Sequence, residues 1–119
     1  MRLNQLAHIT KLSKQINLSI VGQIAIDPVS NEINCLGNIE KETTQVLKNL
    51  LAVLNAGGAK IEDVIKTTIY LTDLKNFQTV NKIYSDFFDV ENPPARACVE
   101  VSSLPKGVLI EIDCIAYLD

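Results

Sequence analysis

Two segments with an apolar stripe at helical spacing, set between segments with strand periodicity, constrain the fold of this chain more than any other feature. The first segment begins after Asn38, a favourable N-cap residue, and stops at Gly57-Gly58. The second begins near Phe77 and is closed by Pro93-Pro94. The stripes consist of Val46, Leu47, Leu50, Leu51 and Leu54, and of Phe77, Val80, Tyr84, Phe87 and Phe88. Because a helix with one apolar stripe must bury it against another layer, a sheet is expected beneath both helices.

The remaining segments have the alternation and the β-branched composition of strands. Leu18–Ile26 alternates, and the turn residues Asp27–Asn31 direct the chain back toward Ile33 as a second strand. Further strands are predicted over 61–71, 94–101 and 108–117. The order β-β-α-β-α-β-β predicts an α+β fold, a two-layer sandwich with both helices on one face of a mixed sheet. The order of the strands within the sheet stays open.

Length, charge and cysteine content limit the class of protein. With 119 residues and no linker-like segment, residues 1–119 are expected to form one domain. A net charge of −3 without a basic run argues against nucleic-acid binding as the main task. Three widely spaced cysteines and one histidine indicate neither a disulfide framework nor an ordinary zinc site. Met1–Ser19 is polar and mixed, and no apolar run reaches the ~18 residues of a membrane span, so we expect a cytoplasmic protein.

One arginine stands at the start of the strand predicted over Pro94–Val101. Period two separates the apolar residues of this strand from Arg96, Cys98 and Glu100, and the strand is expected to be buried. An arginine fixed at the rigid start of a strand can hold a planar anion through two parallel N–H bonds. The ordinary alternative is a surface salt bridge or a solvated strand end. Arg96 is therefore a candidate anion clamp.

A carboxylate interrupts the last predicted strand, Val108–Tyr117. Glu111 lies between Ile110 and Ile112, so it is expected either at a sheet edge or in a specific site. Burial raises the pKa of a carboxyl group and makes it usable as a general acid near neutral pH. The ordinary alternative is a glutamate that faces solvent or pairs with a lysine.

Together these motifs resemble the signature of the Rid family, the reactive intermediate deaminases, also called the YjgF or L-PSP family. Blocks that match the family follow one another in its order over about residues 22–118. They are Gly22-Gln-Ile, Thr44–Leu50, Val64–Leu74, Val80–Tyr84, Pro94-Ala-Arg-Ala-Cys-Val-Glu-Val, Leu104-Pro-Lys-Gly and Ile110-Glu-Ile-Asp. The resemblance implies a chorismate-mutase-like fold and a homotrimer around a central barrel of sheets, with ligand clefts between subunits. The uncovered face of a two-layer sheet independently favours self-association.

The resemblance also implies hydrolysis of 2-imino acids and their 2-enamine tautomers to 2-keto acids and ammonia. Arg96 would clamp the substrate carboxylate, and Glu111 would activate the attacking water and protonate the leaving nitrogen. The implied substrate-binding positions are Gly22, Val21, Asn81, Ala97 and Cys98. No metal or organic cofactor is needed, because an iminium carbon is already electrophilic.

Three of these positions also have a structural interpretation. Asn81 could belong to a solvated helix face. Cys98 is expected to be a small packing residue rather than a nucleophile, since no histidine lies near it in the sequence. Gly22 is expected to permit a bulge or a close approach of the backbone rather than chemistry.

The chain departs from the family pattern in the predicted pocket. His8, Val21 and Pro93 stand where the family usually has a tyrosine, a serine and an aromatic residue. We therefore expect weaker deaminase activity, directed toward imines with apolar side chains. Two other classes stay open. One is a non-catalytic sensor that binds a keto acid or amino acid through Arg96, and the other is an endoribonuclease, for which this acidic chain offers no basic stripe.

Overall fold

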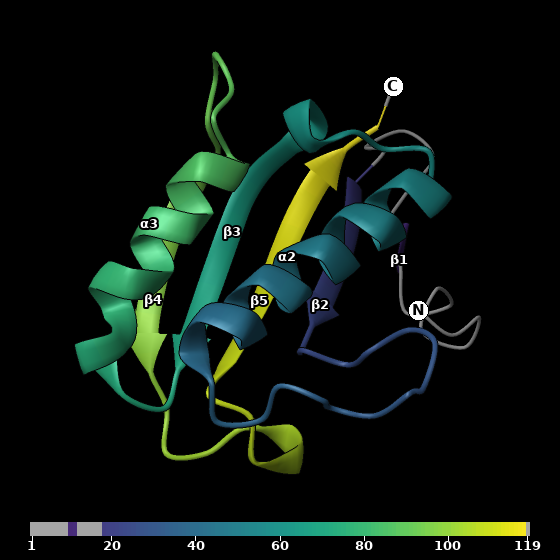
Figure 1. The fold of residues 1–119 in the computed structure, drawn as a ribbon. Coiled ribbons are helices and arrows are strands. Elements are labelled where there is room, and N and C mark those ends of the chain that lie inside the picture. The colour runs from purple at the N-terminus through teal and green to yellow at the C-terminus, as the bar shows by residue number, and fades with distance from the viewer. Residues whose placement is uncertain (1–9, 12–17, 119) are drawn as a thin grey trace.

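The computed structural model describes residues 10–11 and 18–118, which form a mixed sheet with both long helices on one face (Figure 1). The strand order is β1-β2-β5-β3-β4, in which β3 and β4 are parallel and the other neighbours are antiparallel. The predicted α+β sandwich is thus confirmed. Its elements are β1 (Thr10–Lys11), β2 (Leu18–Gln23), α2 (Ile39–Ala56), η1 (Ile61–Asp63), β3 (Val64–Leu71), η2 (Leu74–Asn76), α3 (Phe77–Phe87), β4 (Ala95–Glu100), η3 (Pro105–Gly107) and β5 (Ile110–Tyr117).

Both helices begin where the sequence predicts, and α2 also ends there, whereas α3 ends at Phe87, before the predicted stop at Pro93-Pro94. The Asn38 side chain accepts a hydrogen bond of 3.0 Å from the Lys41 amide, so it caps α2. Gly58, with φ +85°, supplies the left-handed conformation that ends this helix. Before α3, the Asp73 carboxylate accepts a 2.9 Å bond from the Lys75 amide. Among the residues described, no helix is both long enough and apolar enough to cross a bilayer.

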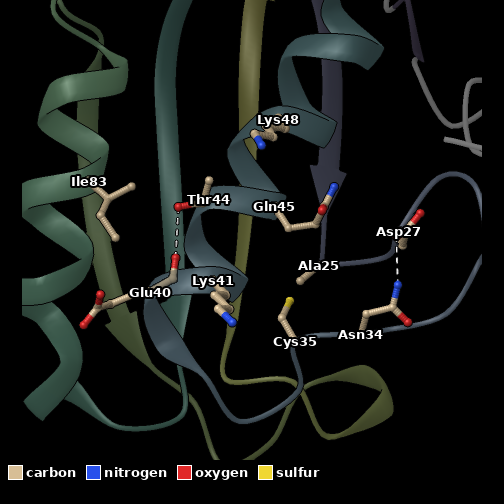
Figure 2. Close-up of a pocket in the computed structure, with 10 residues that line it drawn as sticks. All are labelled: Ala25, Asp27, Asn34, Cys35, Glu40, Lys41, Thr44, Gln45, Lys48 and Ile83. Carbon is tan, nitrogen blue, oxygen red and sulfur yellow. Dashed lines mark hydrogen bonds between the residues drawn. The ribbon is translucent and has the colours of Figure 1, made fainter.

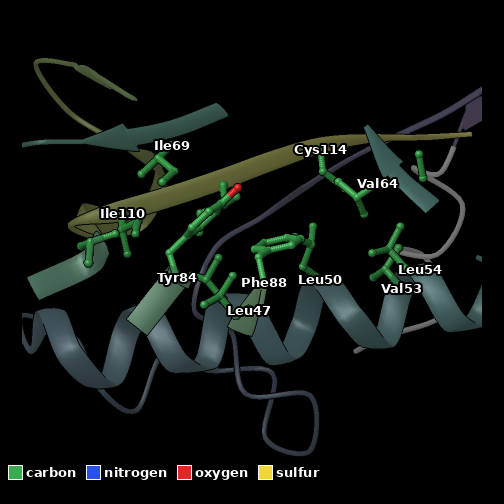
Figure 3. Packing of buried hydrophobic residues seen from close by; sticks show 14 of the residues in the cluster. Leu47, Leu50, Val53, Leu54, Val64, Ile69, Tyr84, Phe88, Ile110 and Cys114 are labelled. Carbon is green, nitrogen blue, oxygen red and sulfur yellow. The ribbon is translucent and has the colours of Figure 1, made fainter. Parts of the chain in front are cut away.

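The core lies between the helices and the sheet (Figure 3). Leu47, Leu50 and Val53 of α2 point from the helix toward the sheet and are almost completely buried. Successive residues of β5 alternate between buried and half-exposed. Ile110, Ile112, Cys114 and Ala116 face the helices, and Glu111, Asp113, Ile115 and Tyr117 face the other way. We call this second side, which neither α2 nor α3 covers, the open face (Figure 1).

The return strand predicted at Ile33 is absent from the structure, which has turns and loop there. The carbonyls of Ile24 and Ile26 are satisfied instead by the Asn49 side chain of α2, whose Nδ2 donates to them at 3.0 and 2.7 Å. The partner of β2 on its outer side is β1, which precedes it in the chain. The start of the strand predicted over 61–71 is also different, because residues 61–63 form η1. The Asn49 side chain thus bonds carbonyl groups that a second strand was expected to bond. The local sequence pattern does not predict this contact, because Asn49 is distant in the sequence.

The prediction that the strand at Arg96 is buried was wrong. β4 is the edge strand of the sheet, and all of its residues are exposed except the half-buried Cys98. Arg96 lies opposite Thr67 and Cys98 lies opposite Ile69, so the polar set faces the helices. Ala97 and Val99 point to the open face. An edge strand leaves room for the long arginine side chain to lie along α3 instead of entering the core.

A buried glutamate connects α2 to two loops, and its loss is expected to be costly. Glu42 is 0% exposed, and its carboxylate accepts bonds from the Gly37 amide at 2.8 Å and the Leu109 amide at 2.9 Å. Glu42→Gln replaces one acceptor oxygen with a donor, which leaves a buried N–H without a partner. We expect the free energy of unfolding to fall by about 2–3 kcal/mol in urea titrations. The matched control is Glu40→Gln, an exposed residue in the same first turn; equal losses for the two variants would contradict this role.

Candidate active site

Arg96 packs along one face of α3. Its guanidinium carbon lies 5.4 Å from the ring centroid of Phe77 and 5.1 Å from that of Tyr84. Its Nη1 donates a short hydrogen bond to Asn81 Oδ1. Phe77, Asn81 and Tyr84 are spaced by four and three residues, so they lie on one side of the helix. Asn81, which was predicted to bind substrate, therefore holds the predicted clamp in place.

The aromatic residues beside Arg96 are themselves fixed. Tyr84 and Thr67 share a buried hydrogen bond of 2.5 Å between their hydroxyl groups, and Thr67 lies directly opposite Arg96 in the β3–β4 ladder. Burial raises the pKa of Tyr84, so its hydroxyl stays neutral. The described partners of the guanidinium are two rings and one amide, none of which carries a negative charge. Its positive charge thus stays available for an anion.

A cavity of about 500 Å³ adjoins this arginine. Its walls come from the end of α3, the loop that follows it and the start of β4. The lining residues are Tyr84, Ser85, Phe88, Asp89, Val90, Pro93, Pro94 and Arg96. The lining combines apolar side chains with Ser85, Asp89 and the Arg96 cation, and its exposed surface is more polar than apolar. The cation at its edge suits a small molecule with an anionic end.

Glu111 lies on the open face of β5, a central strand between β2 and β3. Its side chain is half-buried, and this burial raises the pKa of the carboxyl group, with a smaller contribution from the negative charge of Asp113. The Tyr70 side chain belongs to the same face, because Tyr70 is the cross-strand partner of Glu111. A carboxylate with a raised pKa accepts a proton more readily than an ordinary one.

Gly22 lies beside this carboxyl group. It is opposite Asp113 in the β2–β5 ladder, and a Cβ at Gly22 would lie 3.5 Å from the Asp113 Cβ and 3.7 Å from Glu111 Oε2. These are ordinary contact distances, so the fold of one chain would accept an alanine here. The glycine instead leaves the surface beside Glu111 open. Val21 pairs with Cys114 in the same ladder; its side chain and His8 lie outside what the structure describes.

The predicted site residues fall into two groups on opposite faces of the sheet. Arg96, Asn81 and Cys98 lie on the side of the helices, as their ladder partners and α3 contacts require. Glu111 and Gly22 lie on the open face, which Ala97 also shares. In addition, β3 separates β4 from β5. Within one copy of the chain, the sheet therefore lies between the clamp and the acid.

Cys98 has the properties of a packing residue. It is half-buried against the core, and burial raises the pKa of its thiol despite the opposing charge of Arg96. The neutral thiol is a poor nucleophile. Sequence reasoning missed the roles of Phe77, Tyr70 and Asp113. For Phe77 a signal was present, since its spacing from Asn81 and Tyr84 places it on the arginine-binding side of α3.

A second cavity, of about 660 Å³, lies along α2 and the loop after β2, away from both groups (Figure 2). None of the predicted site residues lines it. The lining residues are Ala25, Asp27, Asn34, Cys35, Glu40, Lys41, Thr44, Gln45, Lys48 and Ile83. Over the part of the chain that the structure describes, histidine, cysteine and acidic side chains do not gather in threes that could hold a metal ion.

Comparison with known proteins yields consistent matches. A family model described as Endoribonuclease L-PSP matches residues 3–118. A RutC family protein of Synechocystis sp. is 52% identical over 101 residues, which cover 85% of this chain and 78% of that protein. Human 2-iminobutanoate/2-iminopropanoate deaminase is 44% identical over 97 residues, 82% of this chain and 69% of the human protein. The crystal structure of E. coli TdcF with bound serine has a TM-score of 0.83 at 34% identity and covers 94% of this chain and 87% of that chain.

Proposed function

The chain belongs to the endoribonuclease L-PSP family, also known as the Rid or YjgF family, and from this premise we propose that it hydrolyses 2-imino acids and their 2-enamine tautomers to 2-keto acids and ammonia. The observation that carries the proposal is the guanidinium of Arg96, held by neutral partners at the edge of a small cavity. A 2-imino acid has a carboxylate for such a clamp and a small side chain for such a cavity. The human relative at 44% identity is named for this reaction.

The proposed reaction needs one group that exchanges protons, and Glu111 is suited to that role. As the oxygen of water bonds to the carbon of the protonated imine, the Glu111 carboxylate accepts a proton from the water. The carboxyl group then returns this proton to the NH2 group, which becomes NH3+. The C–N bond breaks with its electron pair on nitrogen, and the hydroxyl proton passes to the released ammonia, which leaves the keto group and ammonium. A pKa raised toward neutrality serves both the acceptance and the donation.

Because Arg96 and Glu111 lie on opposite faces of one sheet, we propose that the site forms between copies of the chain in a homotrimer. The open face supports this assembly, since Val99 and Tyr117 expose 42% and 46% of their surface there. Light scattering at micromolar concentration is expected to give three times the 13.1 kDa of one chain. A monomer mass would remove both the trimer and the intersubunit site.

Two other functions make different predictions in one experiment. The protein is incubated with an imine generated in situ by an amino acid oxidase, and separately with RNA. A deaminase accelerates decay of the imine, whereas a sensor binds the keto acid through Arg96 without turnover. An endoribonuclease cleaves the RNA, but the net charge of −3 opposes binding to phosphates. Acceleration of imine decay without cleavage of RNA is the expected result.

The altered pocket is proposed to favour apolar substrates. Pro93 and Val90 contribute to the cavity beside Arg96, where Pro93 takes the place of the family's aromatic residue. We expect measurable activity, highest for imines with short apolar side chains. The free thiols of the described chain, Cys35, Cys98 and Cys114, support the cytoplasmic location predicted from the sequence.

A further inference from the structure

Tyr70 and Asp113 form a hydrogen-bonded pair next to Glu111. The Tyr70 hydroxyl donates to Asp113 Oδ2 across 2.9 Å. In the β3–β5 ladder Tyr70 lies opposite Glu111, whereas Thr68 lies opposite Asp113. The tyrosine therefore reaches diagonally past Glu111 to the next residue on the same face. This bond keeps one carboxylate close to another.

The tyrosine is the donor in this pair. Its hydrogen bond to Asp113 is the largest of the effects that raise the pKa of Tyr70, so the tyrosine stays protonated and remains the donor. The Tyr70 hydroxyl thus fixes the position of the Asp113 carboxylate on the open face.

Few other charged groups face Glu111 in the part of the chain that the structure describes. From β2, Gly22 brings no side chain, and both helices pack on the opposite face of the sheet. On β3, Lys66 shares the open face but lies opposite Ile115, four ladder positions from Tyr70. After burial, the charge of Asp113 is the cause that raises the pKa of Glu111.

We propose that Asp113 is a positioning residue of the reaction: anchored by Tyr70, it holds its carboxylate beside Glu111, the group that exchanges a proton with the attacking water. This inference rests on the proposed function, which assigns that exchange to Glu111. A fixed negative neighbour makes a carboxylate a stronger proton acceptor. Asp113 needs no contact with the substrate for this effect.

The kinetic test is the pH dependence of kcat/KM for imine hydrolysis. Activity requires ionised Glu111, so it rises as the pH passes the pKa of that group. Asp113→Asn removes the neighbouring charge, so the acid limb is expected to move to lower pH and the plateau to fall about 3- to 10-fold. Tyr70→Phe keeps the charge, so the acid limb is expected to stay in place or move to higher pH. The matched control Asp86→Asn, on the exposed surface of α3, is expected to leave both unchanged.

A carbon NMR titration of the Glu111 side-chain carboxyl in the free protein gives an independent reading. The titration of Glu111 is expected to shift to lower pH in Asp113→Asn but not in Asp86→Asn. An unshifted titration together with an unshifted acid limb would overturn the inference even if the protein is a deaminase. If the wild type does not hydrolyse imines but the Glu111 titration still shifts in Asp113→Asn, the proposed function is rejected and the interaction between the two carboxyl groups is retained. Thermal unfolding of each variant shows whether a loss of rate comes from a loss of fold.

Discussion

Replacing Glu111 with glutamine is expected to lower kcat for 2-imino acids by about 10²–10⁴-fold, the usual contribution of one positioned proton-transfer group. The amide has nearly the shape of the carboxyl group but can neither accept the proton of the attacking water nor return it to nitrogen. Because Glu111 is half-buried on the open face, where a neutral group is tolerated, the fold should persist. The measurement is the decay of an imine produced by an amino acid oxidase, followed at saturating substrate.

The control for this variant is Glu62→Gln, an identical change at an exposed position in η1. It is expected to match the wild type in rate and in stability. If Glu111→Gln turns over imine as fast as this control, the catalytic assignment of Glu111 is wrong, and another group exchanges the proton.

Replacing Arg96 with alanine is expected to reduce kcat/KM by about 10²–10⁴-fold, because a bidentate clamp supplies two charge-assisted hydrogen bonds of ~1.5–3 kcal/mol each. Stability should change little, since Arg96 lies on an exposed edge strand and loses mainly its stacking on Phe77 and Tyr84. A loss confined to KM would mean that the clamp binds substrate and transition state equally. A fall in kcat as well would mean that it also aligns the imine.

Two further variants test whether activity needs the planar guanidinium of Arg96 or only a positive charge. Arg96→Lys keeps the charge but not the planar fork, so it is expected to recover only a small part of the activity. Lys82→Ala removes an exposed cation next to Asn81 and is expected to behave as the wild type. Full activity in Arg96→Ala would place the substrate elsewhere.

Mixing the two inactive variants tests where the site forms. If Arg96 of one copy acts with Glu111 of another, hybrid trimers contain some sites with both native residues. Random assembly of equal amounts of Arg96→Ala and Glu111→Gln is expected to restore about a quarter of the wild-type activity. Each shared site needs a native Arg96 from one subunit and a native Glu111 from its neighbour, and each is present in about half of the cases. Restoration is possible only for a shared site, so a mixture as inactive as its components would show that each copy builds its own.

Local sequence patterns predicted the secondary structure well where it depends on residues that are close together in the sequence. Asn38 marks the start of α2 and Gly57-Gly58 marks its end, because capping and a left-handed backbone are properties of single residues. The strand expected at Ile33 failed because Asn49, far away in the sequence, takes the carbonyls of Ile24 and Ile26. Such long-range satisfaction of backbone groups leaves no trace in local periodicity.

By itself, the sequence determined the layers of the fold, the family, and the two side chains on which the proposed chemistry depends. Only the tertiary structure decided where these side chains lie relative to each other. Period two tells which residues of a strand share a face, but which face meets the helices depends on strand order and register. Those features placed Arg96 against α3 and Glu111 on the open face, and they brought Tyr70 to Asp113 from 43 residues away. Pairing between distant strands is a property of the whole packed chain, so the positions of these side chains follow only from the tertiary structure. Their chemical types follow from the sequence.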